Sequence, residues 1–247
     1  MNTLELHNQV KTVCDTLHDG CLLVEIMPTL DCPVGCPGCD RGTIDTDLAD
    51  FNDVVLLYET VKKEFPHIQF RLSGGEPTLY PRINELIDLL LNLEPGRKIE
   101  MATNLLGFER LRMNLLDHLF MMVSVYPSTE QVLKERTAAR LFFEYHFKKP
   151  IAANILEHED LAEYGTVRKE DYDPLTCFGP VLLGGTKKIY PCCRAHRFEQ
   201  MYGGTYHMQI TDNNLVEGLA AMIAKTPLCS RCPRIYEDGK KIPTKRS

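Results

Sequence analysis

Residues 32–39 read Cys-Pro-Val-Gly-Cys-Pro-Gly-Cys, so three thiols follow the apolar run 21–27 in the spacing C-x3-C-x2-C. Three clustered thiols cannot all pair with one another in disulfides, and a closed structural zinc site needs a fourth ligand. The spacing favours a cubane iron–sulfur cluster, in which each cysteine binds one iron and the fourth iron stays open. The alternative is a zinc site that a histidine or Asp40 completes.

Apolar, strand-like runs alternate with helical patterns around this loop and through residue 156. Strands are expected over 21–27, 67–72, 98–103, 120–126 and 151–156, and helices over 47–65, 81–95, 107–118 and 129–149. This alternation predicts βαβ units and a parallel sheet. Five strands before residue 158 predict an α/β fold with a curved, incomplete barrel of (βα)5-6 type. Sites in such sheets form at the carboxyl ends of the strands.

The composition is that of a globular protein, with cysteine as the outlier. The chain has 247 residues, 44% hydrophobic, a formal net charge of −6 and 10 cysteines, which fall into an early and a late group. These values exclude a disordered or fibrous chain, and the charge argues against wrapping a polyanion with the whole surface. We expect no membrane span and no secretory signal, and therefore a reducing cytoplasmic location with thiolates used as metal ligands.

A second motif follows the second expected strand, where residues 73–77 read Ser-Gly-Gly-Glu-Pro. Glycines permit close approach of a ligand to the backbone, and a carboxylate pairs with an ammonium group. Alone, this sequence is also that of an ordinary turn between a strand and a helix.

Together, the cysteine loop and the Gly-Gly-Glu-Pro sequence resemble the radical S-adenosylmethionine (SAM) enzymes. The resemblance implies a 4Fe–4S cluster on Cys32, Cys36 and Cys39 whose open iron binds SAM. It also implies that the reduced cluster cleaves SAM to a 5′-deoxyadenosyl radical, which abstracts hydrogen from a substrate. The SAM contacts it implies are Gly74, Gly75, Glu76 and Pro77 for the amino group, with Asn104, Ser124 and Asn154 at later strands.

Two positions depart from the family pattern. Leu105 follows Thr103-Asn104, where the family often has a glycine. Gly38 stands where many relatives have an aromatic residue near adenine, and the cysteine loop is in this respect similar to that of glycyl-radical activating enzymes. Adenine is then expected to pack against Tyr126 or a residue after the fifth strand.

The late cysteines form the second candidate metal site, in a region with a hairpin expected over 181–190 and a helix over 215–224. Four of these cysteines, Cys177, Cys192, Cys229 and Cys232, could bind zinc or an iron–sulfur cluster equally well on spacing. The arrangement resembles the twitch domain, a short relative of the SPASM domain, which carries one auxiliary 4Fe–4S cluster. The ligands this implies are Cys177, Cys192, Cys229 and Cys232. Cys193 is the alternative to Cys192, because adjacent side chains on an extended strand point to opposite faces.

The expected organisation is a core at 1–158 with an N-terminal extension at 1–20, a twitch-like domain at 159–235 and a basic tail at 236–247. Cys14 and Cys21 have no spacing partner and are expected to be buried as small apolar residues.

The expected activity is oxidation or rearrangement of a small molecule, with two 4Fe–4S clusters, SAM and an electron donor such as flavodoxin or ferredoxin, in a monomer. No catalytic acid or base stands out. One alternative substrate is a nucleotide or nucleic acid, suggested by Arg194, His196, Arg197 and the basic tail. An alternative of another class is a non-catalytic zinc-binding protein.

Overall fold

One eight-stranded sheet organises the part of the chain that the computed structural model describes, residues 3–17, 20–32, 48–125, 153–157 and 178–225. The strand order is β5-β4-β3-β2-β1-β6-β7-β8. Neighbours from β5 through β1 to β6 are parallel, and β7 and β8 are added antiparallel. The core strands are β1 (Leu22–Met27), β2 (Ile68–Leu72), β3 (Ile99–Thr103), β4 (Leu119–Val125) and β5 (Ala153–Glu157). The expected α/β fold with an open parallel sheet is confirmed.

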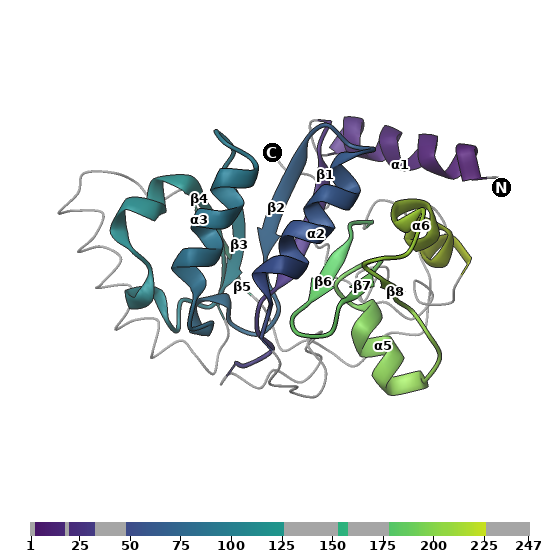
Figure 1. The fold of residues 1–247 in the computed structure, drawn as a ribbon. Helices are drawn as coiled ribbons and strands as arrows, with labels where there is room; N and C mark the ends of the chain where they lie inside the picture. Colours follow the sequence, from purple (N-terminus) through teal and green to yellow (C-terminus); the bar gives the residue numbers. More distant parts are fainter. Residues whose placement is uncertain (1–2, 18–19, 33–47, 126–152, 158–177, 226–247) are drawn as a thin grey trace.

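Two amphipathic helices cover one face of this sheet (Figure 1). α2 (Phe51–Lys62) begins where the Asp50 side chain accepts a hydrogen bond from the Asn52 N–H at 2.8 Å, an N-terminal cap that satisfies one orphan donor. α3 (Ile83–Leu93) buries a stripe of apolar residues, Ile83, Leu86, Ile87 and Leu90. Alternate strand residues pack beneath these helices, and the residues between them point to the other face of the sheet.

The helix expected over 107–118 is wrong in type. The structure has two short 3₁₀ helices there, η2 (Phe108–Arg110) and η3 (Met113–His118). Arg112 between them is extended, with ψ 132°, and its N–H donates to Oδ1 of Asn84 at 2.8 Å. This side-chain contact interrupts the backbone ladder that a continuous α-helix requires. The helix expected over 129–149 lies outside the described residues.

The N-terminal extension contains a helix that the sequence patterns did not indicate, α1 (Thr3–Leu17). It packs against α6 (Leu215–Lys225) from the far end of the chain (Figure 1). His7 Nδ1 lies 3.5 Å from Glu64 Oε2 and 3.4 Å from Glu217 Oε1. These contacts join the extension, the core and the C-terminal segment. No helix among the described residues is long and apolar enough to cross a bilayer.

The C-terminal segment continues the sheet of the core. The expected hairpin is confirmed as β6 (Val181–Leu183) and β7 (Lys188–Tyr190), and β6 pairs in parallel with β1. Two elements were not expected, α5 (Ala195–Tyr202) and β8 (Met208–Gln209). The main cluster of buried apolar residues includes both Val10 and Ile223, so the described parts of the core and the C-terminal segment share one hydrophobic core.

Candidate functional site

The sheet brings the two sequence motifs together at one edge. Because β1, β2 and β3 are parallel neighbours, the segments that follow them meet at their carboxyl ends. These segments contain Cys32, residues 74–77 and Asn104. Ser124 lies near the end of β4, next in the sheet, and Asn154 is in β5, where its side chain lies outside what the structure describes. Cys36 and Cys39 also lie outside the described residues.

The two glycines let the motif pair with the segment that leads into the cysteine loop. The Gly75 N–H donates to Thr29 O at 2.9 Å, and the Glu76 N–H donates to Asp31 O at 2.8 Å. Gly74 has φ +102°, and a Cβ there would lie 2.7 Å from Thr29 O. A Cβ on Gly75 would overlap Asp31 O. The chain's own backbone therefore requires both glycines, whatever ligand approaches them.

Glu76 is a hub of hydrogen bonds at the start of the 3₁₀ helix η1 (Pro77–Leu79). Its side chain is buried, with the residue 0% exposed. Oε1 accepts from Thr78 N at 3.1 Å, Thr78 Oγ1 at 2.6 Å and Thr103 Oγ1 at 2.6 Å, and Oε2 accepts from Asn104 N at 2.6 Å. Burial raises the pKa of Glu76, and these hydrogen bonds oppose the rise. The contact of Glu76 with SAM stays a prediction. The sequence did not indicate that Glu76 accepts hydrogen bonds from the residues around it.

The turn after β3 explains the departure at Leu105. Thr103 Oγ1 accepts from the Leu105 N–H at 2.9 Å, and Asn104 Oδ1 accepts from the Leu106 N–H at 2.9 Å. Leu105 has φ +65°, in the left-handed region that glycine adopts easily. The backbone at this position therefore has the shape that a glycine favours, although the residue is a leucine.

Asn104 also contacts the cysteine loop. Its Nδ2 donates to the Sγ of Cys32 with an N···S distance of 3.5 Å. An amide donor beside a cysteine sulfur suits a thiolate that ligates iron, because the donor stabilises negative charge on sulfur. Together with the three-cysteine donor set, this contact is compatible with a cluster at Cys32.

A polar row crosses the sheet on the face opposite the helices. Glu25, Arg71 and Glu100 are register partners on β1, β2 and β3. Arg71 donates to Glu100 Oε2 from Nε at 2.9 Å and from Nη2 at 2.6 Å, and Ser73 Oγ donates to Glu25 Oε1. Both carboxylates are buried. The only sequence signal was a charged residue inside otherwise apolar strands such as Leu22–Met27.

The late cysteines that the structure describes lie in a turn. Cys192 and Cys193 are partly buried between β7 and α5, and Cys192 O accepts from the Ala195 N–H at 3.2 Å. The two residues are not on an extended strand, so the alternation of side chains does not choose between them. Cys177, Cys229 and Cys232 lie outside the described residues, and the four-cysteine site stays a prediction.

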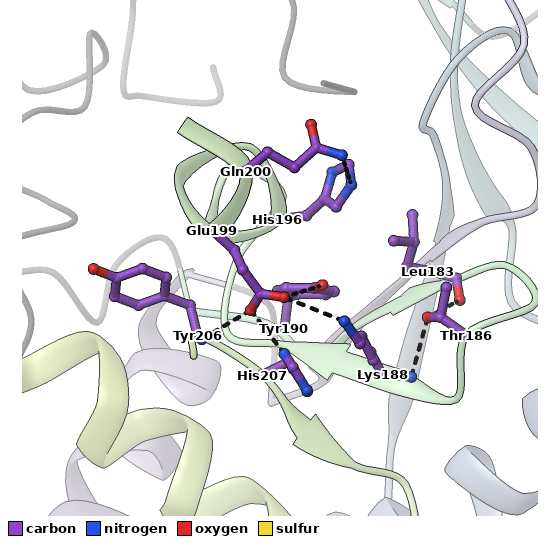
Figure 2. A network of polar contacts seen from close by, with 9 residues as sticks. All are labelled: Leu183, Thr186, Lys188, Tyr190, His196, Glu199, Gln200, Tyr206 and His207. Atoms are coloured by element: carbon purple, nitrogen blue, oxygen red, sulfur yellow. Dashed lines mark hydrogen bonds and ion pairs between the residues drawn. The ribbon is translucent and has the colours of Figure 1, made fainter. Parts of the chain in front are cut away.

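A polar network anchors this turn to the sheet, as Figure 2 shows. Glu199 of α5 accepts from Lys188 Nζ at 3.2 Å and Tyr190 OH at 3.4 Å, both on β7. It also accepts from the Tyr206 N–H at 3.0 Å and lies 2.7 Å from His207 Nδ1. Burial alone would raise the pKa of Glu199, but the hydrogen bonds from Tyr206, His207 and Lys188 hold it below its usual value.

Two basic residues that suggested a nucleic-acid substrate are buried, and so are the two cysteines without a spacing partner. Arg194 and His196 are each 6% exposed, so these two do not contribute to an exposed basic surface of the kind that suits a nucleic-acid backbone, whereas Arg197 is partly exposed. The basic tail lies outside the described residues. Cys14 and Cys21 are buried as expected, and burial raises the pKa of the Cys14 thiol to about 12.

Comparison with known families assigns the chain to one superfamily. The radical SAM superfamily model matches residues 26–150, just over half of the chain, and the chain belongs to that superfamily. Members of this superfamily are enzymes that use a 4Fe–4S cluster and SAM (AdoMet). No curated protein sequence matches the chain.

Two solved structures show a similar fold. BtrN in complex with AdoMet and 2-DOIA has a TM-score of 0.54 and 14% identity, over 87% of this chain and 97% of BtrN. SuiB of Streptococcus suis, bound to the precursor peptide SuiA, has a TM-score of 0.51 and 11% identity, over 92% of this chain and 75% of SuiB. At these identities the likeness concerns the fold.

Proposed function

We propose that this radical SAM enzyme abstracts a hydrogen atom from a small polar molecule, which it oxidises or rearranges. The observation that carries the proposal is the hydrogen-bonded linkage of Glu76, Asn104 and Cys32 at the ends of adjacent strands. In this proposal, Cys32, Cys36 and Cys39 hold a 4Fe–4S cluster, which supplies the electron that cleaves SAM into methionine and a 5′-deoxyadenosyl radical.

The proposed SAM contacts at 74–77 and Ser124 follow the carboxyl ends of β2 and β4 or lie near them, whereas Asn154 is the second residue of β5. The backbone at Gly74 and Gly75, together with Glu76 and Pro77, is proposed to hold the SAM amino group. Ser124 and Asn154 are proposed to contact the rest of the cofactor. Because Glu76 is fully buried in the structure, its carboxylate would first orient the ends of β2 and β3 and thereby the backbone that faces the amino group.

The polar row on the face of the sheet opposite α2 and α3 supports a polar substrate. Burying charged groups costs free energy unless the charges are paired. Apolar side chains at the same three positions would pack without that cost, so the charged row indicates a function beyond packing. Arg71 is paired with Glu100, and Glu25, which accepts a hydrogen bond from Ser73, adds a second carboxylate next to them. The row of two carboxylates and one guanidinium favours a molecule with hydroxyl or amino groups as donors.

An auxiliary 4Fe–4S cluster is part of the proposal. Its ligands would be Cys177, Cys192, Cys229 and Cys232, with Cys193 as the alternative to Cys192. A second cluster could accept the electron that a two-electron oxidation of a substrate carbon releases. The first cluster would receive its electron from a flavodoxin or a ferredoxin, and the enzyme would act as a cytoplasmic monomer.

The central experiment is anaerobic incubation of the reconstituted protein with SAM, a reductant and deuterated polar metabolites. We expect deuterium in 5′-deoxyadenosine when the correct substrate is present. The variant with Cys32, Cys36 and Cys39 all changed to Ala should lose SAM cleavage, while Cys14→Ala, a buried thiol outside the motif, should retain it. Absence of SAM cleavage in the parent protein would contradict the proposal.

The same experiment separates the alternatives. Deuterated oligonucleotides are tested in parallel with the metabolites. Deuterium transfer from the oligonucleotides, but from none of the metabolites, would favour a nucleic-acid substrate. Zinc in place of iron at the late cysteines, in protein produced with ample iron, would contradict the auxiliary cluster.

A further inference from the structure

Asn104 is held at three points between the two motifs of the site. Its backbone N–H donates to Glu76 Oε2 at 2.6 Å, and its Oδ1 accepts from the Leu106 N–H at 2.9 Å. The remaining group, the Nδ2 amide, donates to the Sγ of Cys32 at 3.5 Å. The side chain therefore has one orientation in which its acceptor closes the turn and its donor faces the sulfur.

We propose that Asn104 is a positioning residue that fixes the Cys32 sulfur and makes the cluster on that sulfur easier to reduce. The inference rests on the proposed function, because it concerns the cluster held by Cys32, Cys36 and Cys39. Hydrogen bonds to the sulfurs are among the factors that set the potential of such clusters. The reduced cluster carries one more negative charge than the oxidised one, so an N–H donor stabilises it more.

The surroundings make this donor effective. Asn104 is 6% exposed, so water competes little for its amide, and the local dielectric is low. The left-handed Leu105, at φ +65°, turns the chain away directly after Asn104 and keeps this short side chain at the cysteine loop. A role in SAM binding would use the same amide, but it would leave the potential measured without SAM unchanged.

The test compares two matched asparagine variants. Asn104→Ser keeps an oxygen that can accept from the Leu106 N–H, but its side chain is too short to reach Cys32. Asn84→Ser is the control, because Asn84 also donates through Nδ2, to Arg110 O at 2.8 Å, and accepts through Oδ1, from Arg112 N at 2.8 Å. The measurement is the midpoint potential of the SAM-responsive cluster, titrated without SAM and followed by electron paramagnetic resonance.

We expect Asn104→Ser to lower the ratio of reduced to oxidised cluster about tenfold at a fixed applied potential, a midpoint about 59 mV more negative for a one-electron couple. Asn84→Ser should leave the midpoint unchanged. An unchanged midpoint in Asn104→Ser, at full iron content, would overturn the proposal.

A second variant tests the proposal if the Asn104→Ser variant assembles its cluster poorly. Asn104→Asp keeps the size and the acceptor for Leu106, and replaces the donor with a negatively charged oxygen at Cys32. Its midpoint should fall further than that of Asn104→Ser, and an unchanged midpoint would again overturn the proposal. Failure of the proposed function itself would be seen in the parent protein, as no SAM-responsive cluster and no SAM cleavage.

Discussion

Oε2 of Glu76 lies 2.6 Å from the backbone nitrogen of Asn104 and accepts its hydrogen bond, so the loop after β2 holds the end of β3. The other oxygen of the same carboxylate accepts from the hydroxyls of Thr78 and Thr103. Those hydroxyls accept in turn from the N–H groups of Gly107 and Leu105, which leaves Glu76 as the acceptor for their protons. Together with the Thr78 N–H, which also donates to Oε1, four donors are therefore committed to this one carboxylate.

Glu76→Gln should lower the free energy of unfolding by about 1–3 kcal/mol, because the amide replaces an acceptor oxygen with a donor that faces another donor. The measurement is chemical denaturation under anaerobic conditions. Glu85→Gln, at an exposed position on α3, is the control and should change stability little. Equal stability of Glu76→Gln and the parent would show that the hub does not support the fold.

Gly75→Ala should destabilise the protein by about 3 kcal/mol, because the added methyl group overlaps backbone atoms that cannot move independently. Iron content after reconstitution should fall as well, since Gly75 pairs with the segment that leads into the cysteine loop. Gly96→Ala is the control: Gly96 has φ +82° and nothing within 4 Å of an added Cβ. It should lose about 1 kcal/mol from backbone strain and keep its iron. Similar iron contents in the two variants would contradict the pairing argument.

Cys192→Ala is expected to reduce iron from about eight to about four per chain after reconstitution, as two four-iron clusters predict. Cys193→Ala should keep the full content. The reverse pattern would assign the ligand to Cys193, and full retention in both variants would contradict the four-cysteine site. Iron and sulfide analysis of the two variants, prepared in parallel, provides the measurement.

The Cys14 thiol should resist alkylation in the folded protein at pH 8. Its pKa is raised to about 12 by burial and by the charge of Asp15, so almost none is present as the reactive thiolate. Mass spectrometry after iodoacetamide treatment should find Cys14 unmodified in native protein and modified in urea. Rapid modification of native protein would mean that α1 opens readily.

Glu199→Gln should destabilise the C-terminal segment at neutral pH by about 1–2 kcal/mol, since it weakens hydrogen bonds to a charged group. The folded pKa of Glu199 is lowered, so the contribution of its charge is present above the usual value of 4.5 and is lost as pH falls through the folded pKa. The difference in unfolding midpoint between parent and variant should be present at neutral pH and shrink as the pH falls below about 4.5. A difference that grows in acid would contradict the sign of the shift.

Local patterns in the sequence were sufficient for the strands of the core. β1 to β5 were predicted within a few residues of their observed bounds, because each is a short apolar run flanked by turn residues. The region 107–118 was not, because the contact between Asn84 and Arg112 that divides it joins residues far apart in the chain. The helix α1 was missed for a similar reason. Its apolar stripe is weak, and it packs against α6, which lies far away in the chain.

The sequence by itself determined the family and the first cluster motif, since cysteine spacing and Gly-Gly-Glu-Pro are properties of consecutive residues. Only the tertiary structure decided what the motif residues do for one another. The sheet order placed Asn104 beside Cys32 and turned Glu76 inward to hold both threonines. It also aligned Glu25, Arg71 and Glu100 on three neighbouring strands. Hydrogen bonds between residues that are distant in the chain depend on strand register, and register is fixed by the packing of the whole sheet.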